Sequence, residues 1–71
     1  MKTFAENLRN IRKERGLTQD RVAKIICIDR TTYCKYETGV TVPAMDTFLL
    51  LCRALQASPN QLLGWDVEKT E

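Results

Sequence analysis

The chain has 71 residues and a formal net charge of +2 at pH 7, with 44% of its residues hydrophobic and 28% charged. This balance is typical of a folded globular chain and argues against intrinsic disorder. The length leaves no room for a ligand-sensing domain, a cofactor domain or a deep substrate cleft. We therefore expect one domain over 1–71, with its core at about 4–63 and a short tail at 64–71.

Positive charge is concentrated in the first half of the chain. Residues 1–38 have a net charge of +4, whereas residues 39–71 have a net charge of −2. A basic half on a nearly neutral chain predicts a polyanionic partner at one face, although an ordinary solvated surface gives the same pattern.

The cysteines and the apolar runs indicate the compartment. The N-terminus lacks the apolar stretch of a signal peptide, and no run approaches the length of a membrane span. The three cysteines form no CxxC motif, and without histidine a zinc site lacks ligands. We expect a cytoplasmic protein with three free thiols, at least two of them in the core, and no metal site or membrane contact.

Glycine, proline and capping residues predict five short helices and an all-α fold. The helices are expected at about 3–15, 19–26, 30–37, 44–56 and 59–63. Thr18 and Asp29 are good N-caps, and Ser58 with Gln61 has the spacing of a capping box. Only residues 40–42 alternate weakly like a strand. Helical periodicity predicts a core of Phe4, Leu8, Ile11, Val22, Ala23, Ile26, Tyr33, Tyr36, Met45, Phe48, Leu51, Cys52, Leu55, Leu62 and Leu63.

The second and third expected helices are the pair most informative about function. Only two residues separate Ile26 from Asp29, which is the turn length of a DNA-binding helix-turn-helix. In such a pair the second helix enters the major groove. With Tyr33 and Tyr36 facing inward, the opposite face presents the base-reading candidates Arg30, Thr31, Cys34 and Lys35. Oxidation of Cys34 would alter this face, but a small neutral residue also suits it.

Several separated motifs stand in a characteristic order: Leu8–Arg12, Arg15–Gln19, Val22–Ala23, Tyr36–Gly39, Pro43 and Arg53–Leu55. In order and spacing, this pattern over residues 4–63 resembles the Cro and lambda-repressor (XRE) family of helix-turn-helix domains. The resemblance implies a sequence-specific regulator of transcription that binds double-stranded DNA. It also implies a repressor that acts as a homodimer on a palindromic operator.

The resemblance also implies roles for individual residues. Arg30, Thr31 and Lys35 match base-reading positions, with Cys34 beside them, and Arg30 or Lys35 would favour guanine. Gln19 resembles a glutamine that contacts a phosphate and braces the second helix of the pair. The phosphate-binding candidates are Thr18, Gln19, Thr38, Arg9, Lys13 and Arg21, with Lys24 at the periphery.

One ion pair and two departures from the family pattern complete the expected site. Arg12 resembles an arginine that pairs with a glutamate matching Glu37, which would fix the reading helix against the first helix. The alternative is that Arg12 contacts only phosphate. Cys27 stands where the family usually has glycine, in a turn that often needs positive φ. The stretch 40–42 is apolar where relatives commonly carry cations, so phosphate binding is expected to be weaker there.

Apolar residues near the C-terminal end predict a dimer contact. The candidates are Leu50, Leu62, Leu63, Trp65 and Val67. For Trp65 a second role remains open, because its side chain would also close the core.

Two alternative functions use the same fold: an antitoxin-like or other protein-interaction module, and a restriction–modification controller that also activates. Only seven residues follow Gly64, which disfavours a long protein-binding tail. Catalysis is excluded because the chain has no histidine base, no glycine-rich phosphate loop and no cluster of metal ligands. We expect no cofactor and no small-molecule ligand.

Overall fold

The structure is a computed structural model, and it describes residues 3–64. Five helices occur there: α1 (Phe4–Glu14), α2 (Gln19–Ile25), α3 (Arg30–Thr38), α4 (Met45–Leu55) and α5 (Pro59–Leu63). Within these residues there is no strand, so the all-α prediction is confirmed and the weak alternation at 40–42 does not form one. Trp65 and Val67 lie outside the described residues.

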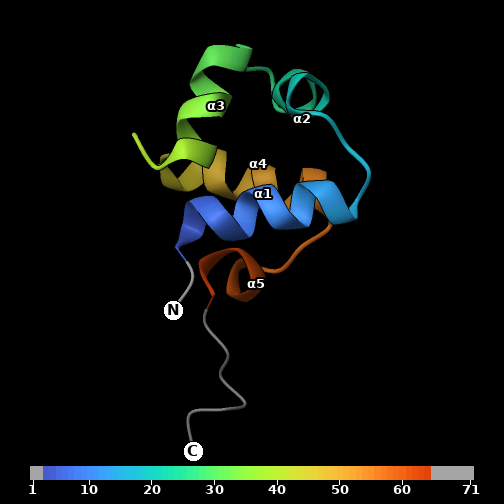
Figure 1. Cartoon of the computed structure of the whole chain (residues 1–71), viewed down its shortest axis with the longest axis vertical. Helices are drawn as coiled ribbons and strands as arrows, with labels where there is room; N and C mark the ends of the chain where they lie inside the picture. The colour runs from blue at the N-terminus through green and yellow to red at the C-terminus, as the bar shows by residue number, and fades with distance from the viewer. Residues whose placement is uncertain (1–2, 65–71) are drawn as a thin grey trace, which may run out of the picture.

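The helices surround one core. α1 packs against α3 and α5, and α2 packs against both α3 and α4. Figure 1 shows α2 and α3 together at one end of the molecule, with α5 at the opposite side of α1. The pair that the sequence singled out therefore forms an end of the molecule. The side chains with no exposed surface are Leu8, Val22, Tyr33, Leu51, Leu55 and Leu62.

Side-chain caps fix where the helices begin. Thr18 accepts a hydrogen bond from the backbone N–H of Arg21 at the start of α2. Ser58 and Gln61 form the predicted capping box at the start of α5. Asp29 occupies the predicted N-cap position of α3 but makes no capping bond there. Its carboxylate accepts instead from the hydroxyl of Thr32, so the predicted cap position is confirmed although the side chain bonds no backbone N–H.

Several predictions about burial were wrong. Met45 is 73% exposed and Leu63 is 51% exposed, because they are the first residue of α4 and the last residue of α5, beyond the packed part of each helix. Leu62 is fully buried, which removes it from the candidate dimer surface. Of the cysteines only Cys52 is buried, since Cys27 lies in an exposed turn and Cys34 is half-buried.

Three long-range hydrogen bonds reach the C-terminal ends of α4 and α5. Arg15 Nε donates to the carbonyl oxygen of Leu55 at 2.8 Å, and Arg15 Nη2 donates to that of Gln56 at 3.2 Å. Asn7 Nδ2 donates to the carbonyl oxygen of Leu62 at 3.2 Å. These bonds satisfy carbonyls at the C-terminal ends of α4 and α5 that lack helical partners, and they tie both helices to α1 or its end.

Candidate nucleic-acid interface

A tight turn sets the relative placement of α2 and α3. The backbone N–H of Cys27 donates to Lys24 and that of Ile28 donates to Ala23, which closes the end of α2. Cys27 has φ +63°, in the left-handed region that is unfavourable for any residue with a Cβ. The strained turn predicted for this position is therefore present.

The outer face of α3 carries the base-reading candidates. Arg30, Thr31 and Lys35 are exposed, and Cys34 is half-buried. The inner face carries Tyr33 and Tyr36, both buried and packed edge to face. The helix thus has one face anchored in the core and one face of hydrogen-bond donors open to a partner.

Gln19 joins the start of α2 to the middle of α3. Its Oε1 accepts a hydrogen bond from Cys34 Sγ at 3.1 Å, and its Nε2 donates to Glu37 Oε1 at 3.0 Å. A side-chain amide carries two N–H donors, so one remains for an outside acceptor. The amide braces α3, and it is only half-buried at the start of α2.

A buried ion pair holds α3 against α1. Arg12 Nε and Nη2 donate to the two carboxylate oxygens of Glu37 at 2.6 and 3.1 Å, and the Glu37 side chain is 2% exposed. Arg12 Nη1 also donates to the carbonyl oxygen of Leu17. The Tyr33 hydroxyl donates to Glu37 Oε2. With Gln19, the carboxylate therefore accepts four hydrogen bonds, and among residues 3–64 no buried side-chain polar atom lacks a partner.

This network shifts the pKa values of its members. Burial raises the pKa of Glu37, but the hydrogen bonds from Arg12, Tyr33 and Gln19 outweigh burial and leave the pKa below its ordinary value. The pKa of Tyr33 is raised by burial and by its hydrogen bond to the carboxylate. The pKa of Arg12 is raised chiefly by its hydrogen bond to Glu37. At neutral pH the network therefore holds one carboxylate, one guanidinium and a neutral phenol.

Tyr33 and Arg15 make stabilising hydrogen bonds that the sequence did not predict. Tyr33 was predicted only as a core residue, yet its hydroxyl fixes Glu37. The two residues are four apart on one helix, a spacing that brings side chains together and could have indicated the contact. Arg15 was noted only as part of a motif, and no local signal connects it to residues forty positions away.

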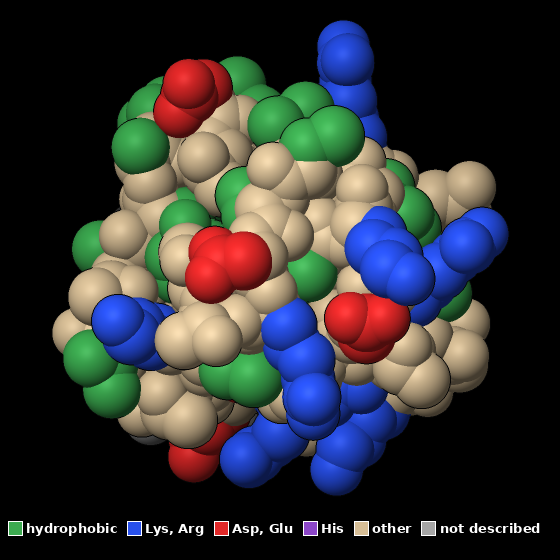
Figure 2. Space-filling view, turned by 90° about the horizontal axis from the view of Figure 1, so that it is seen from above, with side chains coloured by type: hydrophobic (Ala, Val, Ile, Leu, Met, Phe, Trp, Pro, Cys, Tyr) green, Lys and Arg blue, Asp and Glu red, His purple; other side chains and the backbone are tan. Residues whose placement is uncertain are grey.

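The predicted phosphate-binding residues lie at the ends of the helix pair and on α1. Thr18 precedes α2 and Thr38 ends α3, and both are exposed. Figure 2 looks onto the α2–α3 end and shows Lys and Arg side chains gathered over one part of it. The exposed cations among the candidates are Arg9, Lys13, Arg21 and Lys24, and Lys24 Nζ lies 3.4 Å from Asp20 Oδ2.

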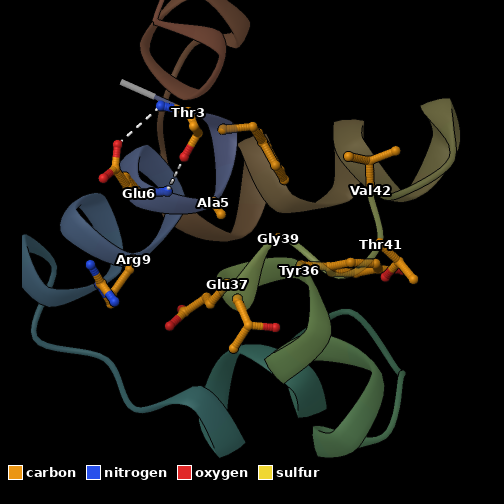
Figure 3. Close-up of a pocket in the computed structure, with 11 residues that line it drawn as sticks. Thr3, Ala5, Glu6, Arg9, Tyr36, Glu37, Gly39, Thr41 and Val42 are labelled. Carbon is orange, nitrogen blue, oxygen red and sulfur yellow. Dashed lines mark hydrogen bonds between the residues drawn. The ribbon is translucent and has the colours of Figure 1, made fainter. Parts of the chain in front are cut away.

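A groove separates the start of α1 from the end of α3. Arg9, Gly39 and Thr41 line it together with Thr38 (Figure 3). It therefore brings a cation of α1 and hydroxyls at the end of α3 to one open surface. Within residues 3–64, no three potential metal-binding side chains lie together, and no helix is long and apolar enough to cross a membrane.

The chain matches the helix-turn-helix family model over residues 8–62. It is 36% identical over 67 residues to the cryptic phage CTXphi transcriptional repressor RstR of Vibrio cholerae, an alignment that covers 93% of this chain and 60% of RstR. The chain spans about half to three fifths of the length of several curated relatives, RstR among them.

Among the solved structures that are similar in fold are the following two proteins. One is the c2 repressor of Salmonella phage P22 in complex with synthetic operator 9T, with a TM-score of 0.85 and 29% identity, covering 93% of this chain and 100% of that one. The other is the restriction-modification controller protein C.AhdI from Aeromonas hydrophila. Its TM-score is 0.80 and its identity 30%, covering 84% of this chain and 91% of that one.

Proposed function

The chain belongs to the helix-turn-helix family, and we propose that it is a transcriptional regulator that binds double-stranded DNA sequence-specifically. The family and fold are those of transcription regulators, which are not enzymes. The observation that supports this proposal is the difference between the two faces of α3. Buried Tyr33 and Glu37 fix its inner face, while Arg30, Thr31 and Lys35 stay exposed on its outer face.

The base-reading residues have the chemistry that major-groove recognition requires. Within residues 3–64, no ion pair involves Arg30 or Lys35, so their donors are available to a partner. Either side chain can donate to the O6 and N7 atoms of guanine, and Thr31 can contact a thymine methyl group. Cys34 is half-buried and donates a hydrogen bond to Gln19. It therefore positions the Gln19 amide as well as shaping the outer surface of α3.

Phosphate contacts at both ends of the helix pair fix the position of α3 along the DNA duplex. Thr18 and Gln19 bind one phosphate at the N-terminus of α2, and Thr38 binds another at the end of α3. Such contacts position a protein on the duplex without reading sequence. The exposed cations Arg9, Lys13 and Arg21 add peripheral contacts.

Two copies of the chain bind one palindromic operator. Leu49 and Leu50 are adjacent, exposed apolar residues on α4, and they border a hollow with Arg53 and Pro59. Burying these leucines against a second copy is favourable, and a two-fold axis through α4 makes the contact self-complementary. The two copies of α3 then enter major grooves about 34 Å apart. Leu63 is exposed but lines a different hollow from Leu50.

Repression is the form of regulation that the comparisons favour. RstR and the P22 c2 protein are both named repressors, and a small protein bound over a promoter blocks polymerase sterically. Similarity to the controller protein C.AhdI supports a second possibility, a regulator that also activates. Both functions require the same DNA-reading surface.

Selection of binding sites from random duplex DNA tests the proposal. We expect the wild type to recover one palindromic motif. Arg30→Ala and Lys35→Ala should each relax the motif at a defined position in both half-sites. The control is Asn60→Ala, which removes an exposed polar side chain from α5 outside both proposed contacts and should leave the motif unchanged. If no motif emerges and binding is weak and salt-sensitive, the proposal fails, and the result would favour a module that binds another protein.

A further inference from the structure

An apolar hollow lies on the molecule away from the outer face of α3. Its volume is about 250 Å³, and it is bordered by the start of α1, the loop before α4, the start of α4 and the end of α5. The residues that line it are all apolar: Phe4, Val42, Pro43, Met45, Phe48 and Leu63.

The lining residues are unusually open to solvent. Val42 is 75% exposed, and Met45 and Leu63 are also exposed. The Phe4 and Phe48 rings are only half-buried, with their centroids 5.9 Å apart. Single exposed apolar residues are common on protein surfaces, but three exposed and three half-buried apolar residues around one hollow mark a surface that another apolar group covers.

The next apolar side chain of the chain is within short reach of this hollow. Leu63 lines the hollow, and Gly64 ends α5 in the left-handed conformation. Trp65 follows at once, so its Cα lies no more than about 7 Å from that of Leu63.

We propose that Trp65 packs into this hollow of its own chain. The indole would cover Val42 and Met45 and rest on Phe48, joining the segment after α5 to the starts of α1 and α4. A second copy competes poorly for the hollow, because a short tether gives the intramolecular contact an effective concentration on the order of millimolar. The sequence left two roles open for Trp65, and the hollow favours closure of the core over a dimer contact.

The contact would also reach the loop that follows α3. Val42 and Pro43 belong to the segment that connects Gly39 to α4, close to the proposed phosphate-binding residue Thr38. Seating Trp65 against this segment restricts its motion. Trp65 packed there would therefore support the loop next to the proposed DNA-binding surface.

Fluorescence tests the proposal directly, because Trp65 is the only tryptophan of the chain. In the native protein we expect emission shifted to the blue and acrylamide quenching several-fold weaker than in the urea-unfolded chain, both unchanged on dilution. The double variant Val42→Ser/Met45→Ser should move emission and quenching toward the unfolded values. Val40→Ser is the matched control, since Val40 is exposed in the same loop and does not line the hollow.

Three results would overturn the proposal. Native emission equal to that of the unfolded chain would place Trp65 in solvent. A blue shift lost on dilution would place it against a second copy. A blue shift that survives the Val42→Ser/Met45→Ser substitutions, in a protein shown by circular dichroism to be folded, would place it elsewhere on the molecule.

Discussion

Replacing Cys27 with glycine is expected to stabilise the protein. Cys27 has φ +63° in the turn between α2 and α3, and its side chain is exposed. The left-handed conformation costs a residue with a Cβ about 1–2 kcal/mol. Glycine avoids this cost, but its greater freedom in the unfolded chain offsets about 0.5–1 kcal/mol. Since no buried contact is lost, the net gain should be roughly 0.5–1 kcal/mol, or about 2–8 °C in Tm.

Thermal and urea unfolding, followed by circular dichroism, measure this gain. Cys27→Ala is the matched control, because it removes the thiol but keeps the Cβ, and its Tm should stay near that of the wild type. Gln56 is the other non-glycine residue with positive φ among those described, at +52°, and Gln56→Gly should give a gain of similar size. If Cys27→Ala stabilised as much as Cys27→Gly, or if Cys27→Gly lowered Tm, backbone strain at position 27 would not limit the stability of the protein.

Three further predictions concern interactions that hold the helices together. Glu37→Gln leaves the Arg12 charge buried without its partner and should cost about 3–5 kcal/mol in urea unfolding; a loss below about 1 kcal/mol would contradict a buried pair. Because the pKa of Glu37 is lowered in the folded state, the stability it contributes is present above the unfolded pKa of about 4.3 and is lost as pH falls through the folded pKa. Acid titration of the unfolding free energy should show a larger loss in the wild type than in Glu37→Gln, which keeps the contribution of Asp29, whose pKa is lowered by its hydrogen bond from Thr32. Arg15→Ala should cost about 1.5–3 kcal/mol, the value of hydrogen bonds to a charged group; Arg15→Glu should cost at least as much, and unchanged stability in both would exclude the proposed capping of α4.

Local signals in the sequence account for most of the fold that was predicted. The cap at Thr18, the capping box at Ser58 and the glycines at 39 and 64 act within one helical turn, so their positions could be predicted without knowledge of the tertiary structure. The errors at Met45 and Leu63 have a different origin. Helical periodicity places a side chain on a face but does not reveal where along that face the packed neighbour ends.

The sequence predicted which residues join α1, α2 and α3 more completely than it predicted the hydrogen bonds between them. The resemblance located Arg12, Gln19 and Glu37, because these residues stand in motifs with fixed spacing. The hydrogen bond from Cys34 to Gln19 depends on how α2 and α3 cross, and a sequence pattern does not contain that geometry. Similarly, Arg15 caps a helix that ends forty residues later, so its role follows only from the folded arrangement.

The most direct test of DNA reading by α3 combines a protein variant with an altered base. In a selected operator, the guanine at the position relaxed by Arg30→Ala or Lys35→Ala would be replaced with 7-deazaguanine, which lacks the major-groove acceptor N7. If α3 reads that base, this change weakens binding of the wild type roughly tenfold, within the range of a bidentate contact, and has little effect on the variant that already lacks the donor. Equal losses for the wild type and the variant would show that the side chain does not contact that base and that α3 does not read it.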